Sequence, residues 1–226
     1  MKVNKIIIGI IPAGNLFLNN DPYEDKYTFV NNYGKRLREC NINFIGIIPV
    51  DGRIDEKQLE ICDGFLAPGG AIVNSYHLQV IDYAIKNNKP YLGVCLGMQV
   101  IGVYNLLKEE ALKRNLSYDS VDDMEYIRKI LKQENIPLLR KLEKDDYKKH
   151  WYSINRDDVE LSKHLIELDE KSVLYDIYRK KQINISSMHG CEIIKVGDFI
   201  DTHTDSGTVK EINSVLCCRY NVVKIH

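Results

Sequence analysis

The chain alternates short runs of apolar residues with amphipathic stretches. Residues 6–11 form a β-branched run that stops at Pro12-Ala13-Gly14, which is typical of a buried strand ending in a turn. Similar apolar runs follow at 44–50, 64–67 and 91–94. The pattern therefore predicts four strands in the first half of the chain.

Helices are predicted between these strands. Asp21-Pro22 supplies an N-cap and a first-turn proline, and apolar residues recur every three or four positions from Tyr23 to Leu37, so we expect a helix that ends near Cys40. Residues 78–85 show the same periodicity. Strands and helices that alternate at this spacing predict an α/β fold with a doubly wound, mostly parallel sheet and helices on both faces.

The pattern changes after Tyr104. Half of the residues from Lys108 to Lys149 are charged, which predicts a charged surface insert at about 108–149 rather than a core layer, with one amphipathic helix at 121–131. Beyond Trp151, strand-like runs predict an antiparallel extension of the sheet, at 182–188, 192–196, 199–203, 208–212 and 221–225. We treat residues 1–226 as a single domain that carries this insert.

The charge balance and apolar runs exclude several classes of protein. The 31 basic and 32 acidic side chains leave a formal net charge of -1, so a basic nucleic-acid binder is not expected. The apolar run at 6–11 is far shorter than the ~20 residues of a membrane helix. It is also shorter than the core of a signal peptide. We therefore expect a cytoplasmic location and no membrane partner.

The cysteines and histidines do not have the spacing of a metal site. The six cysteines include no C-x-x-C pair, which argues against a zinc ribbon or a thioredoxin-type redox site. His77, His150, His164 and His203 lack paired ligand spacing as well. No metal site is expected.

One segment has the pattern of a nucleophile elbow. In Gly93-Val94-Cys95-Leu96-Gly97-Met98-Gln99, a strand meets a cysteine flanked by glycines and then a helix-like stretch. The glycines leave room for a sharp turn, and the helix N-terminus favours the thiolate of Cys95. The Leu96 N–H would face a developing oxyanion. On the residues alone, a buried cysteine that ends a core strand is an equal alternative.

A second loop complements the first. Phe65-Leu66-Ala67-Pro68-Gly69-Gly70 ends a strand in two glycines, whose N–H groups could supply another oxyanion donor. By itself this loop is also an ordinary glycine-rich turn. Both loops would open at the carboxyl edge of a parallel sheet, where ligands bind, so the two together indicate a site.

Four segments together resemble a known family. Ala67-Pro68-Gly69-Gly70, the elbow segment 93–99, Ser187-Met188-His189-Gly190 and the segment 206–212 are similar, in this order, to the class I glutamine amidotransferase superfamily. The nearest branch is the γ-glutamyl-γ-aminobutyrate hydrolase and γ-glutamyl hydrolase type. The resemblance covers most of residues 5–106 and 182–226, and it implies a flavodoxin-like fold.

The resemblance also implies a Cys-His-Glu triad. Counting from Ser206-Gly207 places the family's histidine on His226 and its carboxylate two residues beyond. A rival register places Asn221 on the histidine position, which implies an inactive site. Cys95 would be the nucleophile, with Gly69, Gly70 and Leu96 as the oxyanion hole. The family's substrate-binding positions fall on Gln99, Ser187, Met188 and His189.

The expected activity is hydrolysis of a γ-glutamyl amide bond through a glutamyl thioester on Cys95, without a cofactor. The substrate would be glutamine or a γ-glutamylated amine. One alternative is a glutaminase subunit that delivers ammonia to a separate synthase partner, and another is a catalytically silent binding protein. The partner would be that synthase or a second copy in a homodimer.

Overall fold

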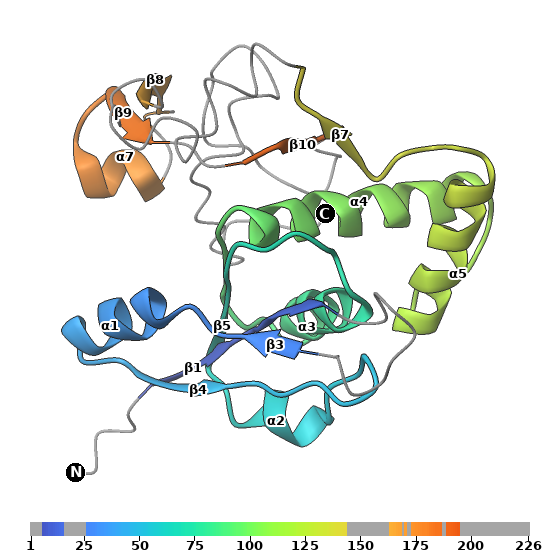
Figure 1. Cartoon of the computed structure of the whole chain (residues 1–226), viewed down its shortest axis with the longest axis horizontal. Coiled ribbons are helices and arrows are strands. Elements are labelled where there is room, and N and C mark those ends of the chain that lie inside the picture. The colour runs from blue at the N-terminus through green and yellow to red at the C-terminus, as the bar shows by residue number, and fades with distance from the viewer. Residues whose placement is uncertain are drawn as a thin grey trace.

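A computed structural model of the chain describes residues 6–15, 26–143, 163–168, 170, 173–186 and 189–194. Its centre is a parallel sheet with the strand order β4-β1-β5-β6 (Figure 1). The strands are β1 (Ile7–Ile10), β4 (Asn43–Gly46), β5 (Gly64–Ala67) and β6 (Tyr91–Gly93). All four predicted strands are confirmed. With the helices between them they form the predicted α/β, flavodoxin-like fold.

The sheet is buried deeply at its centre. Every residue of β5 is buried, as expected of a parallel strand between two other strands. Gly9 in β1 leaves space for larger neighbours, because a Cβ there would lie 2.6 Å from Ile47 Cδ1 and 2.8 Å from Cys62 Sγ. Close packing of this kind fixes the sheet against its covering layers.

Four helices connect or extend these strands: α1 (Asn31–Glu39), α2 (Glu56–Glu60), α3 (Ser75–Lys86) and α4 (Leu96–Lys113). The predicted helix at 78–85 is confirmed as α3. Helices α3 and α4 pack together, and the Tyr104 hydroxyl of α4 donates a hydrogen bond to Asp82 of α3 over 3.0 Å. This contact lies in the buried core.

The first predicted helix is too long at its start. Residues 26–28 form strand β3 (Lys26–Thr28), which pairs antiparallel with β2 (Ala13–Asn15), and α1 begins only at Asn31. The β2–β3 hairpin forms instead of the first helical turns because Tyr27 packs edge-on against the buried Tyr76, with ring centroids 6.0 Å apart. The predicted N-cap Asp21-Pro22 lies outside the described residues.

The charged segment contributes to the core, contrary to our expectation. Its predicted helix is confirmed as α5 (Val121–Gln133), which starts at a capping box formed by Ser120 and Asp123. Met124, Ile127 and Leu131 are fully buried on its inner face. Charged residues dominate the composition, but apolar side chains at helical spacing pack α5 against α3 and α4. Residues 144–149 lie outside the described part.

Antiparallel pairing follows in the second half. Strand β7 (Leu139–Lys141) pairs with β10 (Cys191–Ile193), and β8 (Lys163–Glu167) pairs with β9 (Gln182–Ser186) beside α7 (Val173–Tyr178). Within the described residues these are separate two-stranded ladders, so they do not extend the parallel sheet as predicted. The predicted strands at 199–203, 208–212 and 221–225 lie outside the described residues.

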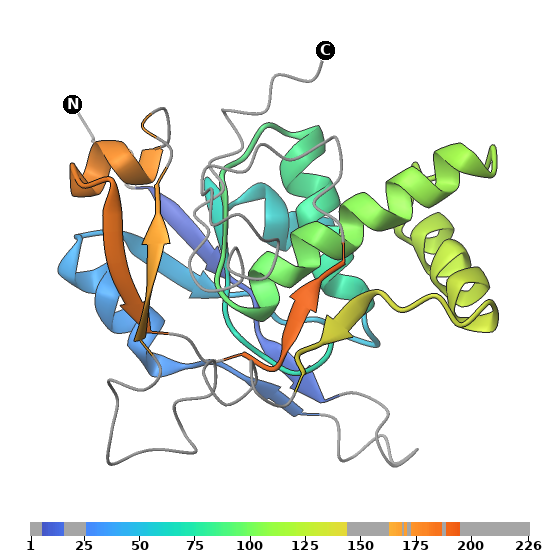
Figure 2. The same cartoon turned by 90° about the horizontal axis from the view of Figure 1, so that it is seen from above.

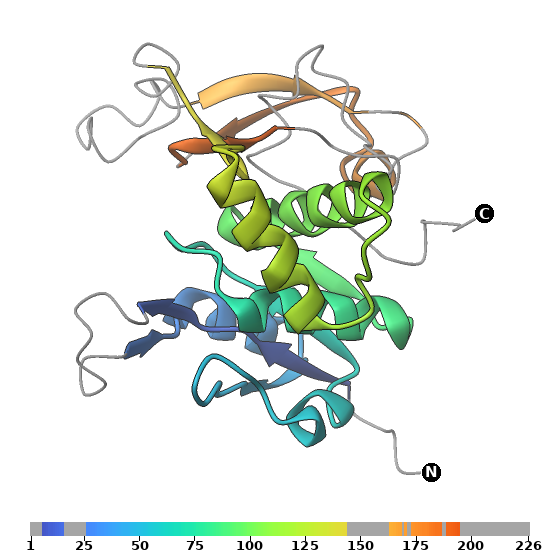
Figure 3. The same cartoon turned by 90° about the vertical axis from the view of Figure 1, so that its right-hand side faces the viewer.

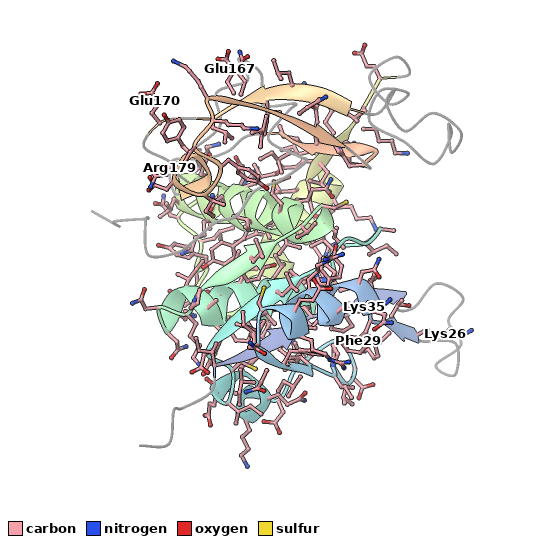
Figure 4. The ribbon with its side chains drawn as sticks, turned by 90° about the vertical axis from the view of Figure 1, so that its left-hand side faces the viewer. Lys26, Phe29, Lys35, Glu167, Glu170 and Arg179 are labelled. Carbon is pink, nitrogen blue, oxygen red and sulfur yellow. The ribbon has the colours of Figure 1, made fainter. Side chains whose placement is uncertain are left out.

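The ladders occupy their own layer. Figures 1 and 3 show β7 and β10 on the side of α4 that faces away from the parallel sheet. Figure 2 shows β8, β9 and α7 at one end of the molecule and α5 at the other. In Figure 4, Glu167 and Arg179 of the β8–β9 region lie far from Lys35 of α1. The amino-terminal end of α4 thus lies between the sheet and the β7–β10 ladder.

The buried imidazole of His77 predicts a pH-dependent stability. Its Nδ1 accepts the Asn74 N–H at 3.0 Å, and burial lowers the pKa of His77 from 6.5 to about 4. In the unfolded chain, His77 therefore binds a proton near pH 6.5. In the folded chain it stays neutral until about pH 4. The free energy of unfolding should fall by ~3 kcal/mol as the pH is lowered through this window.

Thermal unfolding of the wild type and of His77→Gln at several pH values between 7 and 4 tests this linkage. The variant should lose less melting temperature than the wild type as the pH falls, because it removes the titrating group. Parallel curves for the two proteins would contradict the assignment.

Candidate active site

Two loops meet at the carboxyl ends of β5 and β6. The two strands are neighbours in register, with Ala67 opposite Gly93, and the Val94 N–H donates a hydrogen bond to the Ala67 carbonyl over 2.9 Å. Beyond this point the chain continues as Pro68-Gly69-Gly70 on one side and Cys95 on the other. The parallel sheet therefore brings the two predicted loops together.

Cys95 has the backbone conformation that the elbow pattern predicts. Its φ is 53° and its ψ is -109°, a strained combination for a residue with a side chain, and it is the N-cap of α4. The Gly97 N–H donates to the Pro68 carbonyl at 3.2 Å and to the Val94 carbonyl at 3.0 Å. These bonds hold the turn on both sides of the cysteine.

The flanking glycines are required by close backbone contacts. A Cβ at Gly97 would lie 2.1 Å from the Ala67 carbonyl oxygen, and a Cβ at Gly93 would lie 2.4 Å from the Gly97 carbonyl carbon. Since these obstacles are backbone atoms, they cannot move aside as a flexible side chain would. Helix α4 can therefore start this close to β5 and β6 only with glycine at both positions.

Backbone groups from two segments act on the Cys95 thiol. Cys95 receives hydrogen bonds from the backbone of Leu96 and of Gly70. Burial raises the pKa of Tyr33 in α1, and the Gly69 backbone lowers it in part. Both glycines of the predicted loop lie near Cys95: the Gly70 backbone lowers the pKa of the thiol, and a Cβ on Gly69 would lie 3.6 Å from the sulfur.

Burial governs the protonation of the nucleophile. Desolvation raises the pKa of the Cys95 thiol above its ordinary value and outweighs the two backbone hydrogen bonds, which lower it. The first residue of α4 lowers the pKa of Cys95, which is the direction that the prediction gave, but burial outweighs this effect. Nucleophilic attack by Cys95 would need a general base that removes the thiol proton.

Two of the predicted substrate-binding residues, Gln99 and His189, contact the same backbone carbonyl. Gln99 is buried and its Nε2 donates a hydrogen bond to the Cys191 carbonyl over 2.8 Å, while Nδ1 of the buried His189 lies 3.2 Å from the same oxygen. Ile193 packs on Gly102, where a Cβ would lie only 2.3 Å from its Cγ2. Gln99 thus joins β10 to the first turn of α4. The predicted residues Ser187, Met188 and His226, and the rival Asn221, lie outside the described residues.

Sequence reasoning missed two residues beside Cys95. Tyr33 was assigned only to the apolar stripe of a helix, and Cys191 only to a group of scattered thiols. Burial has the larger effect on both pKa values, but charge on Cys95 also raises the pKa of Tyr33, and charge on Cys191 also raises that of Cys95. Cys191 stands two residues after His189, which was the available signal for it. The sequence contains no comparable signal for Tyr33, since its neighbour Gly69 is distant along the chain.

Comparison with protein-family models decides the family. The model described as glutamine amidotransferase class-I matches residues 23–198. The chain belongs to this family. The match includes β5, β6, the elbow and the segment that contains β10, so the geometry above is that of a class I glutamine amidotransferase domain.

Curated relatives share part of the chain. CTP synthase from Chlamydia abortus (strain DSM 27085 / S26/3) is 30% identical over 102 residues, which covers 44% of this chain and 18% of that protein. CTP synthase from Staphylococcus carnosus (strain TM300) is 26% identical over 211 residues, which covers 91% of this chain and 35% of that protein. The chain thus spans about a third or less of the length of these relatives.

Solved structures support the fold. A protein from Thermoplasma acidophilum, described as a putative subunit of GMP synthase, has a TM-score of 0.50 at 16% identity, over 90% of this chain and 74% of that one. A glutamine amidotransferase from Thermotoga maritima also has a TM-score of 0.50, at 13% identity, over 88% of this chain and 66% of that one. At these identities the likeness concerns the fold alone.

The described part of this amidotransferase domain contains no cluster of three or more histidine, cysteine or acidic side chains that could hold a metal ion. Nor does any helix in that part have the length and apolar character needed to cross a membrane.

The close contacts of Gly97 predict how far a larger side chain in the elbow lowers the free energy of unfolding. Gly97→Ala places its Cβ against the Ala67 carbonyl and should lower the free energy of unfolding by ~3 kcal/mol or more. Gly34→Ala is a matched control, because its Cβ would meet only the tip of the Phe44 ring at 3.0 Å, inside a helix. Chemical denaturation of both variants measures the difference. Equal stabilities would contradict the close approach of α4 to β5.

Proposed function

We propose that the chain is a glutaminase domain that hydrolyses glutamine and delivers the ammonia to a separate synthase partner. The Cys95 thiol would lose its proton to His226 and attack the γ-carbonyl carbon of glutamine. The N–H groups of Leu96 and Gly70 would stabilise the oxyanion. His226 would return the proton to the departing ammonia, and water would hydrolyse the glutamyl thioester to glutamate and free thiol.

One observation carries the proposal. Within the described residues, Cys95 is the one strained residue with a nucleophilic side chain at the joint edge of β5 and β6, and the backbones of Leu96 in α4 and Gly70 in the β5 loop lower the pKa of its thiol. Acyl transfer through a tetrahedral intermediate requires preorganised hydrogen-bond donors around the nucleophile. A buried structural cysteine has no need of either feature.

The comparisons favour a glutaminase over a general γ-glutamyl hydrolase. The curated relatives named above are CTP synthases, and one of the similar structures is described as a putative GMP synthase subunit. Each of these descriptions includes a synthase, which agrees with ammonia delivery to such a partner. The γ-glutamyl hydrolase type is the competing proposal.

The raised pKa of Cys95 supports the need for His226. A thiol that burial keeps protonated at neutral pH has to transfer its proton to a group with a pKa near 7, and imidazole is that group. His226 is the histidine that the resemblance places in this role. The substrate would be held by Gln99 and by the segment of Ser187, Met188 and His189.

The substrate range tests the proposed function. Purified protein should release glutamate from L-glutamine at least about tenfold faster than from γ-glutamyl-p-nitroanilide, because a site built to release ammonia needs no pocket for a bulky amine. Cys95→Ala should abolish both reactions. Equal rates on the two substrates would favour the γ-glutamyl hydrolase, and no glutamate from either would favour the silent binding protein.

A second test asks whether glutamine hydrolysis depends on a bound partner. The tagged chain, recovered from its own host at low salt, should hydrolyse glutamine faster than the same preparation after a high-salt wash that removes bound proteins. Identical rates before and after the wash would contradict ammonia delivery to a separate synthase.

Labelling of the nucleophile makes a further prediction. A diazo-oxo-norleucine analogue of glutamine should modify Cys95 faster than the buried Cys62 or the exposed Cys40, because only Cys95 combines a substrate site with oxyanion donors. Peptide mapping by mass spectrometry locates the label. A label spread evenly over the cysteines would contradict the assignment.

The general base is tested by the pH dependence of two variants. His226→Ala should reduce kcat by at least ~10² at neutral pH and move the alkylation of Cys95 by iodoacetamide to more alkaline pH, because burial alone raises the pKa of the thiol. Asn221→Ala should leave both unchanged. Full activity in His226→Ala, or a loss in Asn221→Ala as large as in His226→Ala, would contradict this assignment of the base.

A further inference from the structure

We propose that Asn74, at the start of α3, is a positioning residue for the nucleophile: its side-chain amide joins the β1 loop (residues 11–14) to the β5 loop (residues 68–73) and so holds the β5 loop against Cys95. The inference rests on the proposed function, because it assigns a catalytic consequence to this contact. Neither the elbow pattern nor the four resembling segments include Asn74.

Two side chains at the start of α3 bind the β1 loop. Asn74 is the N-cap of α3, and its Nδ2 donates a hydrogen bond to the Gly14 carbonyl over 3.1 Å. The hydroxyl of the buried Tyr76 donates to the Pro12 carbonyl over 2.9 Å. A Cβ on Gly14 would lie only 2.7 Å from that hydroxyl, so the tyrosine occupies space that a side chain at position 14 would need. The β1 loop is therefore tied to α3 at two carbonyls.

Asn74 binds the β5 loop as well. Its Nδ2 also lies 3.4 Å from the Ile72 carbonyl oxygen and 3.4 Å from the Tyr76 hydroxyl. Its backbone N–H donates to Nδ1 of the buried His77 over 3.0 Å, which fixes the backbone from which the side chain extends. Because an amide carries two N–H groups, this one side chain can join the two loops.

The β5 loop contacts both the β1 loop and the nucleophile. A Cβ on Gly70 would lie 3.2 Å from Ala13 Cβ and 2.8 Å from Leu96 Cδ2. A Cβ on Gly69 would lie 3.3 Å from Cys95 Cβ and 3.6 Å from its sulfur. The β1 loop, the β5 loop and the start of α4 thus meet beside Cys95, and Ala13 limits how far the β5 loop can move.

The two glycines of the β5 loop make this arrangement depend on its anchors, because glycine leaves φ and ψ unrestricted. The Pro68 carbonyl accepts the Gly97 N–H at 3.2 Å, and the Ile72 carbonyl lies at the Asn74 amide. The glycines lie between these two points. Loss of the Asn74 amide would free one end of the loop and would also loosen the β1 loop beside Gly70.

The position of the loop has two opposite consequences for Cys95. Burial raises the pKa of the thiol, and the Gly70 backbone lowers it in part. A loop that moves away from the sulfur would no longer present a preorganised donor to the oxyanion, which slows acyl transfer. The same movement would expose the sulfur to water and to small reagents, which speeds alkylation. Hydrolysis and alkylation should therefore change in opposite directions.

Asn74→Asp tests this directly. Aspartate is as good an N-cap as asparagine, but it puts a carboxylate in place of the donor beside the Gly14 and Ile72 carbonyls. The kcat for glutamine should fall about tenfold, with KM within about twofold of the wild type. Alkylation of Cys95 by iodoacetamide should become at least about threefold faster at neutral pH, and its pH profile should shift to lower pH as the thiol becomes less buried.

Tyr76→Phe is a second variant, because it removes only the hydroxyl that binds Pro12 and keeps the buried ring. It should change kcat and alkylation in the same directions. Ser120→Ala is the matched control, since it removes the hydrogen bond from the Asp123 N–H that caps α5 and should lower the melting temperature without changing kcat or the alkylation of Cys95. The buried Cys62 should remain unlabelled in every variant.

Unchanged kcat and unchanged alkylation of Cys95 in Asn74→Asp and Tyr76→Phe would overturn the positioning role. Labelling of Cys62 together with Cys95 would also overturn it, because it would indicate that the whole core has loosened. Absence of glutamine hydrolysis in the wild type would instead count against the proposed function, while the alkylation of Cys95 would still report on Asn74.

Discussion

The approach of α4 to the ends of β5 and β6 is the constraint on which the rest of the site depends. Backbone atoms of three segments meet at Gly93, Ala67 and Gly97, with no space for a Cβ at either glycine. This contact forces Cys95 into its positive-φ conformation and directs the Leu96 N–H to the sulfur. The surrounding core packs α4 against α3 and α5 and so supplies the stability that offsets the strain.

Three layers of the fold converge on this turn. The β5 loop supplies the Gly70 backbone, the start of α4 supplies Cys95 and Leu96, and β10 reaches α4 through the Gln99 side chain. Each partner comes from a different part of the chain. The site therefore exists only when the parallel sheet and the β7–β10 ladder have both formed around the start of α4.

The sequence predicted the parallel sheet and the elbow because both leave local patterns. Apolar runs bounded by glycine and proline marked the four strands, and Gly93 and Gly97 marked the sharp turn at Cys95. The predicted start of α1 was wrong because the β2–β3 hairpin around Tyr27 forms in place of the first helical turns. That hairpin depends on tertiary contacts. The core face of α5 was missed because composition counts charges on all sides of a helix, whereas packing depends on the apolar face alone.

The different surroundings of Gly69 and Gly70, and the raised pKa of Cys95, could not be predicted in the same way. Both depend on which backbone groups lie near the sulfur and on how far the sulfur is buried, and these are properties of the folded chain. The proposed glutaminase reaction requires Cys95 to form a covalent bond to the glutamyl group. Rapid acid quenching after mixing the protein with radiolabelled L-glutamine, followed by peptide mapping, tests it directly. A glutamyl thioester should appear on the peptide that contains Cys95 and should be absent in Cys95→Ala; label on another residue, or an equal amount in the variant, would contradict this mechanism.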